Sequence, residues 1–194
     1  MKLKRHSGFT LIEMMIALVV LAVLLMIGAP AFTELIANNR MLTHVYEMRA
    51  ALNSARSEAL AQRTSVTFCR SNDGVACGGT WKEGYIAFID SNGDGTVDDP
   101  NDPDGDQVFL AKLIDANSLD ITYDNGNMVQ FNSRGYASGP GGFTSGTFTL
   151  CDYRGAEDAS GVVVTAGGIV RAAVEDPNDP GVARDLEGDE LDCP

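Results

Sequence analysis

The strongest constraint on this chain is an apolar run close to its N-terminus. Between Phe9 and Phe32 only Thr10 and Glu13 are polar. As an α-helix this run would be about 36 Å long, enough to cross a hydrocarbon core of about 30 Å. A basic leader, residues 1–8, precedes the run. We therefore expect the leader to stay in the cytoplasm and the C-terminal part to cross the membrane.

Glu13 is the one charged residue in the run. A carboxylate in the first turns of a membrane span is costly, and such residues are functional candidates for that reason. A carboxylate buried among apolar helices needs a cationic partner. The alternative is that Glu13 lies near the membrane interface and reaches water.

The segment Gly-Phe-Thr-Leu-Ile-Glu, from Gly8 to Glu13, resembles the class III signal of type IV pilins and pseudopilins. The resemblance implies that a prepilin peptidase cleaves between Gly8 and Phe9 and methylates the new amino group of Phe9. Glu13 then becomes the fifth mature residue and Pro30 the twenty-second, where many pilins carry a helix-bending proline. An ordinary signal peptide is the alternative, but its apolar region spans only about 7–15 residues.

The same resemblance implies how these residues act. Glu13 would recruit and register the next subunit by pairing with the amino group of Phe9 on a neighbour. Pro30 would kink or soften the helix because it lacks an N–H. The implied partners are other pilins or pseudopilins, the prepilin peptidase, an inner-membrane assembly platform and membrane lipid.

The helical pattern continues beyond Pro30 as an apolar stripe on a polar helix. Its members recur at spacings of three, four or seven residues. They are Leu35, Leu42, Val45, Leu52, Ala55 and Ala59. We predict one helix from Phe9 to Gln62, with its first half in lipid and its second half under a sheet.

Beyond Arg63 the sequence predicts short strands rich in β-branched and aromatic residues. The expected strands are residues 64–69, 85–89, 108–110, 119–123, 128–132, 147–151, 162–165 and 169–173. The turn signal Asp124–Asn127 predicts a hairpin between the strands on either side of it. We expect residues 135–146 to be flexible and the tail from Glu175 to be irregular.

The resulting fold class is α+β, a long N-terminal helix packed on an antiparallel β domain. The expected parts are a leader (1–8), a transmembrane and assembly helix (9–32), its amphipathic continuation (33–63) and a periplasmic β domain (64–194).

The β domain resembles the GspH/FimT family, which includes minor pseudopilins of type II secretion and minor type IV pilins. The resemblance is carried by Val66–Ser71, Cys77, Trp81, Gly84–Asp90, Phe131–Gly135 and Phe148–Cys151. It implies a long N-terminal helix packed on β-sheets, which agrees with the pattern of expected elements.

All four cysteines lie in the exported part, where oxidation is expected. Three pairings are possible for Cys69, Cys77, Cys151 and Cys193. We favour Cys69–Cys77, which closes a short local loop, with Cys151–Cys193, which ties the tail back to a strand. A zinc site is the alternative, but there is no Cys-x-x-Cys and the mature chain has only His44 as an imidazole ligand.

An acidic loop follows the second expected strand. Oxygen-bearing side chains alternate in it as in a calcium loop, with Gly95 at the sharp turn. The candidate ligands are Asp90, Asn92, Asp94 and Asp98. The twelfth position is Asn101 rather than a bidentate Glu, and paired helices are not expected around the loop. Calcium and a solvated surface loop both stay open.

The net charge of −13 argues against polyanionic partners. Some FimT-type pilins bind DNA through a Gly-Arg-x-Arg motif near the C-terminus. The matching segment here is Gly168–Arg171, where Ile169 replaces the first Arg. Arg171 is the candidate DNA contact, but phosphate binding relies on clustered cations. A DNA-binding pilin is therefore the less favoured reading.

Nothing in the sequence pairs a nucleophile with a base, so we do not expect an enzyme. No cofactor is expected apart from the possible Ca²⁺. The combined prediction is a minor pilin or pseudopilin, anchored by one span in a bacterial inner membrane with a periplasmic domain. It would then join a pilus or pseudopilus near the tip. A DNA-binding pilin and a membrane-anchored calcium module are the alternatives.

Overall fold

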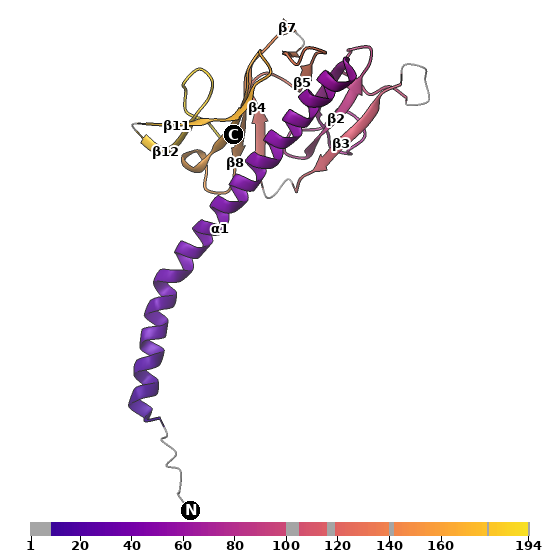
Figure 1. Ribbon diagram of the computed structural model, residues 1–194. Helices are drawn as coiled ribbons and strands as arrows, with labels where there is room; N and C mark the ends of the chain where they lie inside the picture. The colour runs from indigo at the N-terminus through magenta and orange to yellow at the C-terminus, as the bar shows by residue number, and fades with distance from the viewer. Residues whose placement is uncertain (1–8, 100–104, 116–118, 140–141, 178, 194) are drawn as a thin grey trace, which may run out of the picture. The chain divides into compact units, whose positions relative to one another are not determined.

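The computed structural model describes residues 9–99, 105–115, 119–139, 142–177 and 179–193. The chain divides into two compact units, Met1–Arg40 and Met41–Pro194. Helix α1, Leu11–Gln62, begins in the first unit and ends in the second (Figure 1). The predicted long N-terminal helix is confirmed.

The first unit exposes its apolar side chains. Phe9 is 81% exposed and Leu18 is 60% exposed. Every described Leu, Ile, Val and Met side chain from Leu11 to Met26 is at least half exposed. Among the described residues, no helix is both long and apolar enough to cross a membrane.

The second unit contains two larger antiparallel sheets and one small one (Figure 1). The six-stranded sheet has the order β3-β2-β1-β5-β6-β7 and the four-stranded sheet the order β10-β9-β8-β4. The strands of the first are β1 Ser65–Arg70, β2 Gly84–Asp90, β3 Gln107–Leu113, β5 Met128–Phe131, β6 Ala137–Gly139 and β7 Gly142–Phe143. Those of the second are β4 Asp120–Tyr123, β8 Gly146–Cys151, β9 Ser160–Val164 and β10 Val170–Ala172. The small sheet pairs β11, Val174–Asp176, with β12, Asp179–Arg184, and a short 3₁₀ helix η1 spans Ala156–Asp158.

One core joins the end of α1 to both larger sheets. The helix contributes Met41, Val45, Met48, Ala51, Leu52, Ala55 and Ala59. Apart from Ala51, which is next to Leu52, these positions alternate in spacing between four and three residues, so they form one face of the helix. Phe68 of β1 and Phe148 of β8 meet in this core with ring centroids 6.1 Å apart. The ring centroids of Trp81 and Phe148 are 4.9 Å apart. The aromatic cluster therefore connects the two sheets.

The predicted stripe is partly wrong. Leu42 is 50% exposed, and Met41 and Met48 occupy the buried face in its place. Leu42 is one residue away from Met41, a rotation of about 100° around the helix. Leu35 belongs to the first unit and is also exposed.

The predicted hairpin around Asp124–Asn127 is also wrong. Strand β4 pairs with β8, and β5 pairs with β1. The turn therefore carries the chain from one sheet to the other. Ile121 and Phe131 both reach the core from their separate sheets, because each strand alternates buried and less buried residues.

Two segments expected to lack regular structure contain short strands. The glycine-rich stretch after Gly135 forms β6 and β7. The tail, expected to be irregular from Glu175, forms the hairpin of β11 and β12. Their side-chain patterns are too short for the alternation that identifies a strand from sequence.

The outer faces of both larger sheets are covered. On the four-stranded sheet, Ala183 and Leu191 of the tail pack against Cys151. On the six-stranded sheet, Val97 of the acidic loop packs against Phe88 and its neighbours. Disulfides Cys69–Cys77 and Cys151–Cys193 lie in these outer layers, and they are the pairs favoured from the sequence.

Removing the disulfides should destabilise the second unit unequally. Loop-closure entropy predicts a loss of about 4 kcal/mol for the Cys151–Cys193 link, which closes 42 residues, and about 2.5 kcal/mol for the 8-residue link. We expect the Cys151→Ser/Cys193→Ser variant to unfold at a lower temperature than Cys69→Ser/Cys77→Ser. Near-UV circular dichroism of the full chain in detergent would measure both unfolding temperatures. A lower unfolding temperature for Cys69→Ser/Cys77→Ser would contradict the predicted order.

Candidate functional sites

The first candidate site is the start of α1, where Thr10 and Glu13 cap the helix. Glu13 Oε2 accepts hydrogen bonds from the Thr10 backbone N–H at 3.2 Å and the Thr10 hydroxyl at 3.3 Å. The Glu13 backbone N–H donates to Thr10 Oγ1 at 3.3 Å. This reciprocal pattern is a capping box, which satisfies donors that the first helical turn leaves unpaired.

Thr10 is therefore a site residue that sequence reasoning missed. The signal was available, because Thr-x-x-Glu before an apolar run is the pattern of a capping box. The box places the Glu13 carboxylate at the positive end of the helix dipole. The Glu13 carboxylate thus has a hydrogen-bond partner, Thr10, within its own chain.

Of the other residues predicted to act in processing and assembly, Phe9 and Pro30 lie within the described residues. Gly8, the predicted cleavage position, lies outside the described residues, and Phe9 is exposed. The backbone at Pro30 is helical, and α1 passes through it without a break. Cleavage between Gly8 and Phe9, and the softening role of Pro30, stay predictions.

The second candidate site is the acidic loop after β2, which Asp90 holds to the sheet. Asp90 is fully buried, and Asp106 is 2% exposed, so the expectation of a wholly surface loop is wrong at its two ends. Asp90 Oδ2 accepts bonds from Thr67 Oγ1 at 2.6 Å and Gln130 Nε2 at 2.9 Å. Its two oxygens also accept the backbone N–H groups of Gly93 and Gly95. A buried carboxylate is tolerated here because donors surround it.

The remaining candidate calcium ligands are engaged with each other. Asn92 Nδ2 donates to Asp94 Oδ2 at 3.1 Å and to Asp98 Oδ2 at 2.8 Å. Hydrogen bonds from Thr96 hold the pKa of Asp94 below its ordinary value. Within the described ranges, no group of three or more His, Cys, Asp or Glu side chains is placed to hold a metal ion. Calcium binding stays a prediction.

Arg171 lies on β10, an edge strand of the four-stranded sheet. Its Nη1 donates to the carbonyl of Ala172 at 3.4 Å. This geometry does not test a nucleic-acid contact, so the DNA-binding pilin with Arg171 as its contact stays the less favoured alternative.

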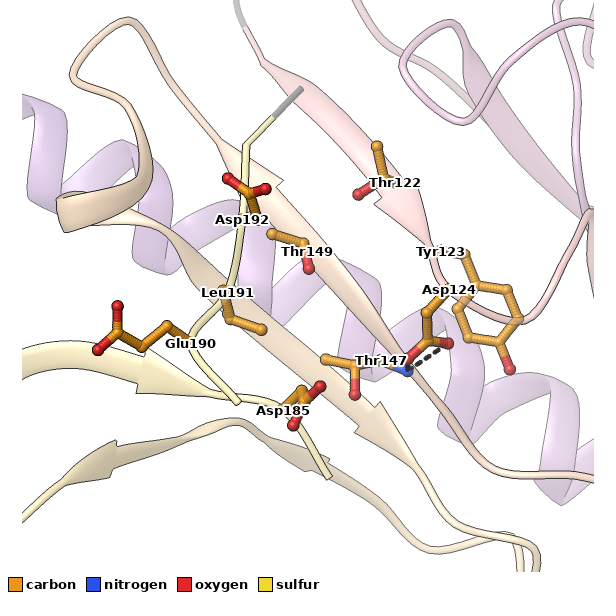
Figure 2. Close-up of a pocket in the computed structure, with 9 residues that line it drawn as sticks. All are labelled: Thr122, Tyr123, Asp124, Thr147, Thr149, Asp185, Glu190, Leu191 and Asp192. Carbon is orange, nitrogen blue, oxygen red and sulfur yellow. Dashed lines mark hydrogen bonds between the residues drawn. The ribbon is translucent and has the colours of Figure 1, made fainter. Parts of the chain in front are cut away.

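The third candidate site is a pocket that the sequence did not reveal. It has a volume of about 270 Å³ and lies between the outer face of β4 and β8 and the tail segment 185–192 (Figure 2). Its lining comprises Thr122, Tyr123, Asp124, Thr147, Thr149, Asp185, Glu190, Leu191 and Asp192. The threonines face outward because Phe148 and Leu150, which alternate with them on β8, point into the core.

The carboxylates of the pocket are held in place by backbone groups. Both oxygens of Asp124 accept the Thr147 N–H, at 3.0 and 2.9 Å (Figure 2). Asp185 Oδ1 accepts three consecutive N–H groups of residues 187–189. Partial burial of the carboxyl group, and then the charges of Asp185 and Glu187, raise the pKa of Asp124 above its ordinary value. The pocket is therefore a region of concentrated negative charge.

Two protein-family models match the chain. The model of the type II transport protein GspH matches residues 44–168. The model of the prokaryotic N-terminal methylation motif matches residues 3–29. The chain therefore belongs to the GspH family. No curated protein sequence matches it.

Solved structures of similar fold include two crystal forms of the type IV minor pilin FimU of Pseudomonas aeruginosa. One is 21% identical, with a TM-score of 0.50, covering 72% of this chain and 90% of FimU. The other is 17% identical, with a TM-score of 0.50, covering 69% and 92%. The minor pseudopilin EpsH from the type 2 secretion system of Vibrio cholerae is 12% identical, with a TM-score of 0.44, covering 68% and 94%. The likeness to FimU shows that the chain has a pilin-like fold.

Asp90 should matter for stability far more than Asp94. Replacing Asp90 by Ala leaves the buried Thr67 hydroxyl and the N–H groups of Gly93 and Gly95 without their acceptor, and we expect a loss of about 3 kcal/mol in unfolding free energy. Asp94→Ala is the matched control, because Asp94 is exposed and its bonds lie within the loop. Thermal unfolding of the two full-length variants would measure this, and equal losses would contradict an anchoring role for Asp90.

The calcium prediction requires its own measurement. If the loop binds Ca²⁺, millimolar CaCl₂ should raise the unfolding temperature of the unaltered chain relative to EGTA, by mass action on the folded state. Asp94→Ala should lose this shift while Asp73→Asn, an exposed acid elsewhere, keeps it. An unaltered chain with no Ca²⁺ effect would end the prediction.

Proposed function

We propose that this chain is a minor pilin or pseudopilin that is cleaved between Gly8 and Phe9 and assembled into a filament. The filament is a type II secretion pseudopilus or a type IV pilus, with this subunit at or near the tip. The GspH family match and the N-terminal methylation motif support the proposal. No catalytic role is part of it.

The observation that carries the proposal is the exposed apolar surface of the first unit. A row of apolar side chains from Leu11 to Met26 is at least half exposed. Soluble monomers rarely leave so large an apolar surface to water, so another apolar phase covers it. We propose membrane lipid before assembly and the helices of neighbouring subunits afterwards. The subunit would sit in the inner membrane by this segment, with the second unit in the periplasm.

Glu13 provides the specificity that apolar packing lacks. Its carboxylate lies on a surface that filament packing would remove from water, where an unpaired charge is strongly unfavourable. The methylated amino group of Phe9 on a neighbour is a cation that can reach it. Thr10 keeps the carboxylate hydrogen-bonded until that cation arrives. A subunit out of register would bury the charge without a partner, which selects the correct register.

The proposed sequence of events names the partners. A prepilin peptidase removes the leader and methylates Phe9, and an inner-membrane assembly platform then extracts the subunit from lipid. Other pilins or pseudopilins receive it in the filament. The acidic second unit stays outside the helical core of the filament.

Glu13→Ala should separate processing from assembly. We expect normal removal of the leader but at least a tenfold lower amount of the chain in sheared filaments, because the buried charge pair cannot form. Thr10→Val is the matched control: it removes the hydroxyl of the capping box but keeps the carboxylate, so incorporation should fall much less. Immunoblots of membrane and filament fractions would measure both variants.

A substitution at Gly8 should act at the earlier step, leaving the unprocessed chain in the membrane. Normal filament incorporation of Glu13→Ala would contradict the role proposed for the carboxylate. Normal processing of a Gly8 variant would contradict the proposed cleavage site.

A further inference from the structure

The pocket between the four-stranded sheet and the tail contains a buried hydroxyl group with no partner. Thr147 is 2% exposed, and its Oγ1 has no hydrogen-bond partner among the described residues. Its side chain points toward Leu191 and Asp185 across the pocket (Figure 2). An unpaired buried hydroxyl is unfavourable, so a ligand that donates a hydrogen bond to it would be favoured.

The charge of the pocket indicates the sign of that ligand. Of its nine lining residues four carry a carboxyl group, and none of the nine carries a positive charge. Arg184 partly compensates the negative charge of Glu190, because its Nη2 lies 3.6 Å from Glu190 Oε1. Asp124, Asp185 and Asp192 remain on the walls of the pocket (Figure 2). Charge complementarity therefore favours a cation.

The size of the pocket and its apolar parts indicate the kind of cation. No described group of three carboxylates is placed to hold a metal ion. A volume of about 270 Å³ corresponds to about nine water molecules and lies just below the range of pockets for drug-sized ligands. Leu191 provides an apolar surface beside the carboxylates (Figure 2). Lysine and arginine match this arrangement, with an apolar stem and a charged end.

We propose that the pocket binds a lysine or arginine side chain from a neighbouring subunit of the filament. The charged end donates to the Thr147 hydroxyl and to the carboxylates of Asp124 and Asp185, and its stem packs on Leu191. The identity of the neighbour rests on the proposed function, whereas cation binding by the pocket does not. The tail wall, residues 185–192, lies outside the segment matched by the GspH family model.

Binding is measured with small probes on the full mature chain in detergent micelles. The probes are N-acetyl-lysine methylamide, N-acetyl-arginine methylamide and the uncharged N-acetyl-norleucine methylamide. Backbone amide chemical shifts report the site. The two cationic probes should saturate in the millimolar range and shift the amides of residues 122–124, 147–149 and 185–192. The norleucine probe should leave them unchanged.

Two variants separate this pocket from general surface charge. Thr147→Val should weaken binding of the cationic probes at least threefold without lowering the unfolding temperature, because it removes an unpaired hydroxyl and keeps the shape. Asp185→Asn should weaken binding at least as much and still accept the N–H groups of residues 187–189. Asp73→Asn is the matched control, since Asp73 Oδ1 also accepts loop N–H groups, from Val75 and Ala76, and it should leave binding unchanged.

Three results would overturn the proposal. One is equal shifts with the norleucine probe, and another is equal weakening by Asp73→Asn and Asp185→Asn, which would indicate diffuse charge. The third is saturation by spermidine with no response to either amino-acid probe, which would assign the pocket to a free polyamine. If the probes fail to bind but the chain is found in filaments, the pocket proposal alone falls. If they bind but the chain never enters filaments, the proposed function and the subunit assignment fall together.

Discussion

The second unit depends on the burial of one face of α1 against two sheets at once. From Met41 to Ala59 the buried positions, with Ala51 beside Leu52, recur every three or four residues, so a single stripe serves both sheets. Phe68 and Phe148 meet beside that stripe and connect the sheets. Because the inner faces are occupied by the helix, each sheet presents its second face outward. Those outer faces carry the apolar residues Cys69, Phe88 and Cys151. Exposing them to water is unfavourable, so each face requires a cover.

The two covers use their acidic residues in different ways. In the loop after β2, Asp90 turns inward and receives four hydrogen bonds, so its charge fastens the loop to the sheet. In the tail, Leu191 supplies the apolar contact, while the acidic side chains around it line a pocket over the threonines of β8. The disulfide at Cys193 holds the end of this cover against the strand. One acidic segment thus fastens a loop to its sheet, and the other lines a pocket.

Local patterns in the sequence were sufficient for the features that depend on near neighbours. They predicted the length of α1, the short-range Cys69–Cys77 link and the central strands of both sheets. They failed where strand pairing is decided at long range: the turn signal at Asp124–Asn127 is a real turn, but β4 and β5 have better partners in different sheets. The pocket could not be predicted, because Asp185 approaches Asp124 only after the tail folds back over β8. The Thr10–Glu13 capping box could have been predicted, since both residues lie within four positions.

We propose that the apolar first unit and its capped Glu13 make this chain a filament subunit. The most direct test is mass spectrometry of the N-terminal peptide of the chain recovered from sheared filaments. The account predicts a peptide that begins at N-methylated Phe9, in an amount well below that of the main subunit. A chain that retains Met1 and its leader, found only in the membrane fraction, would contradict it.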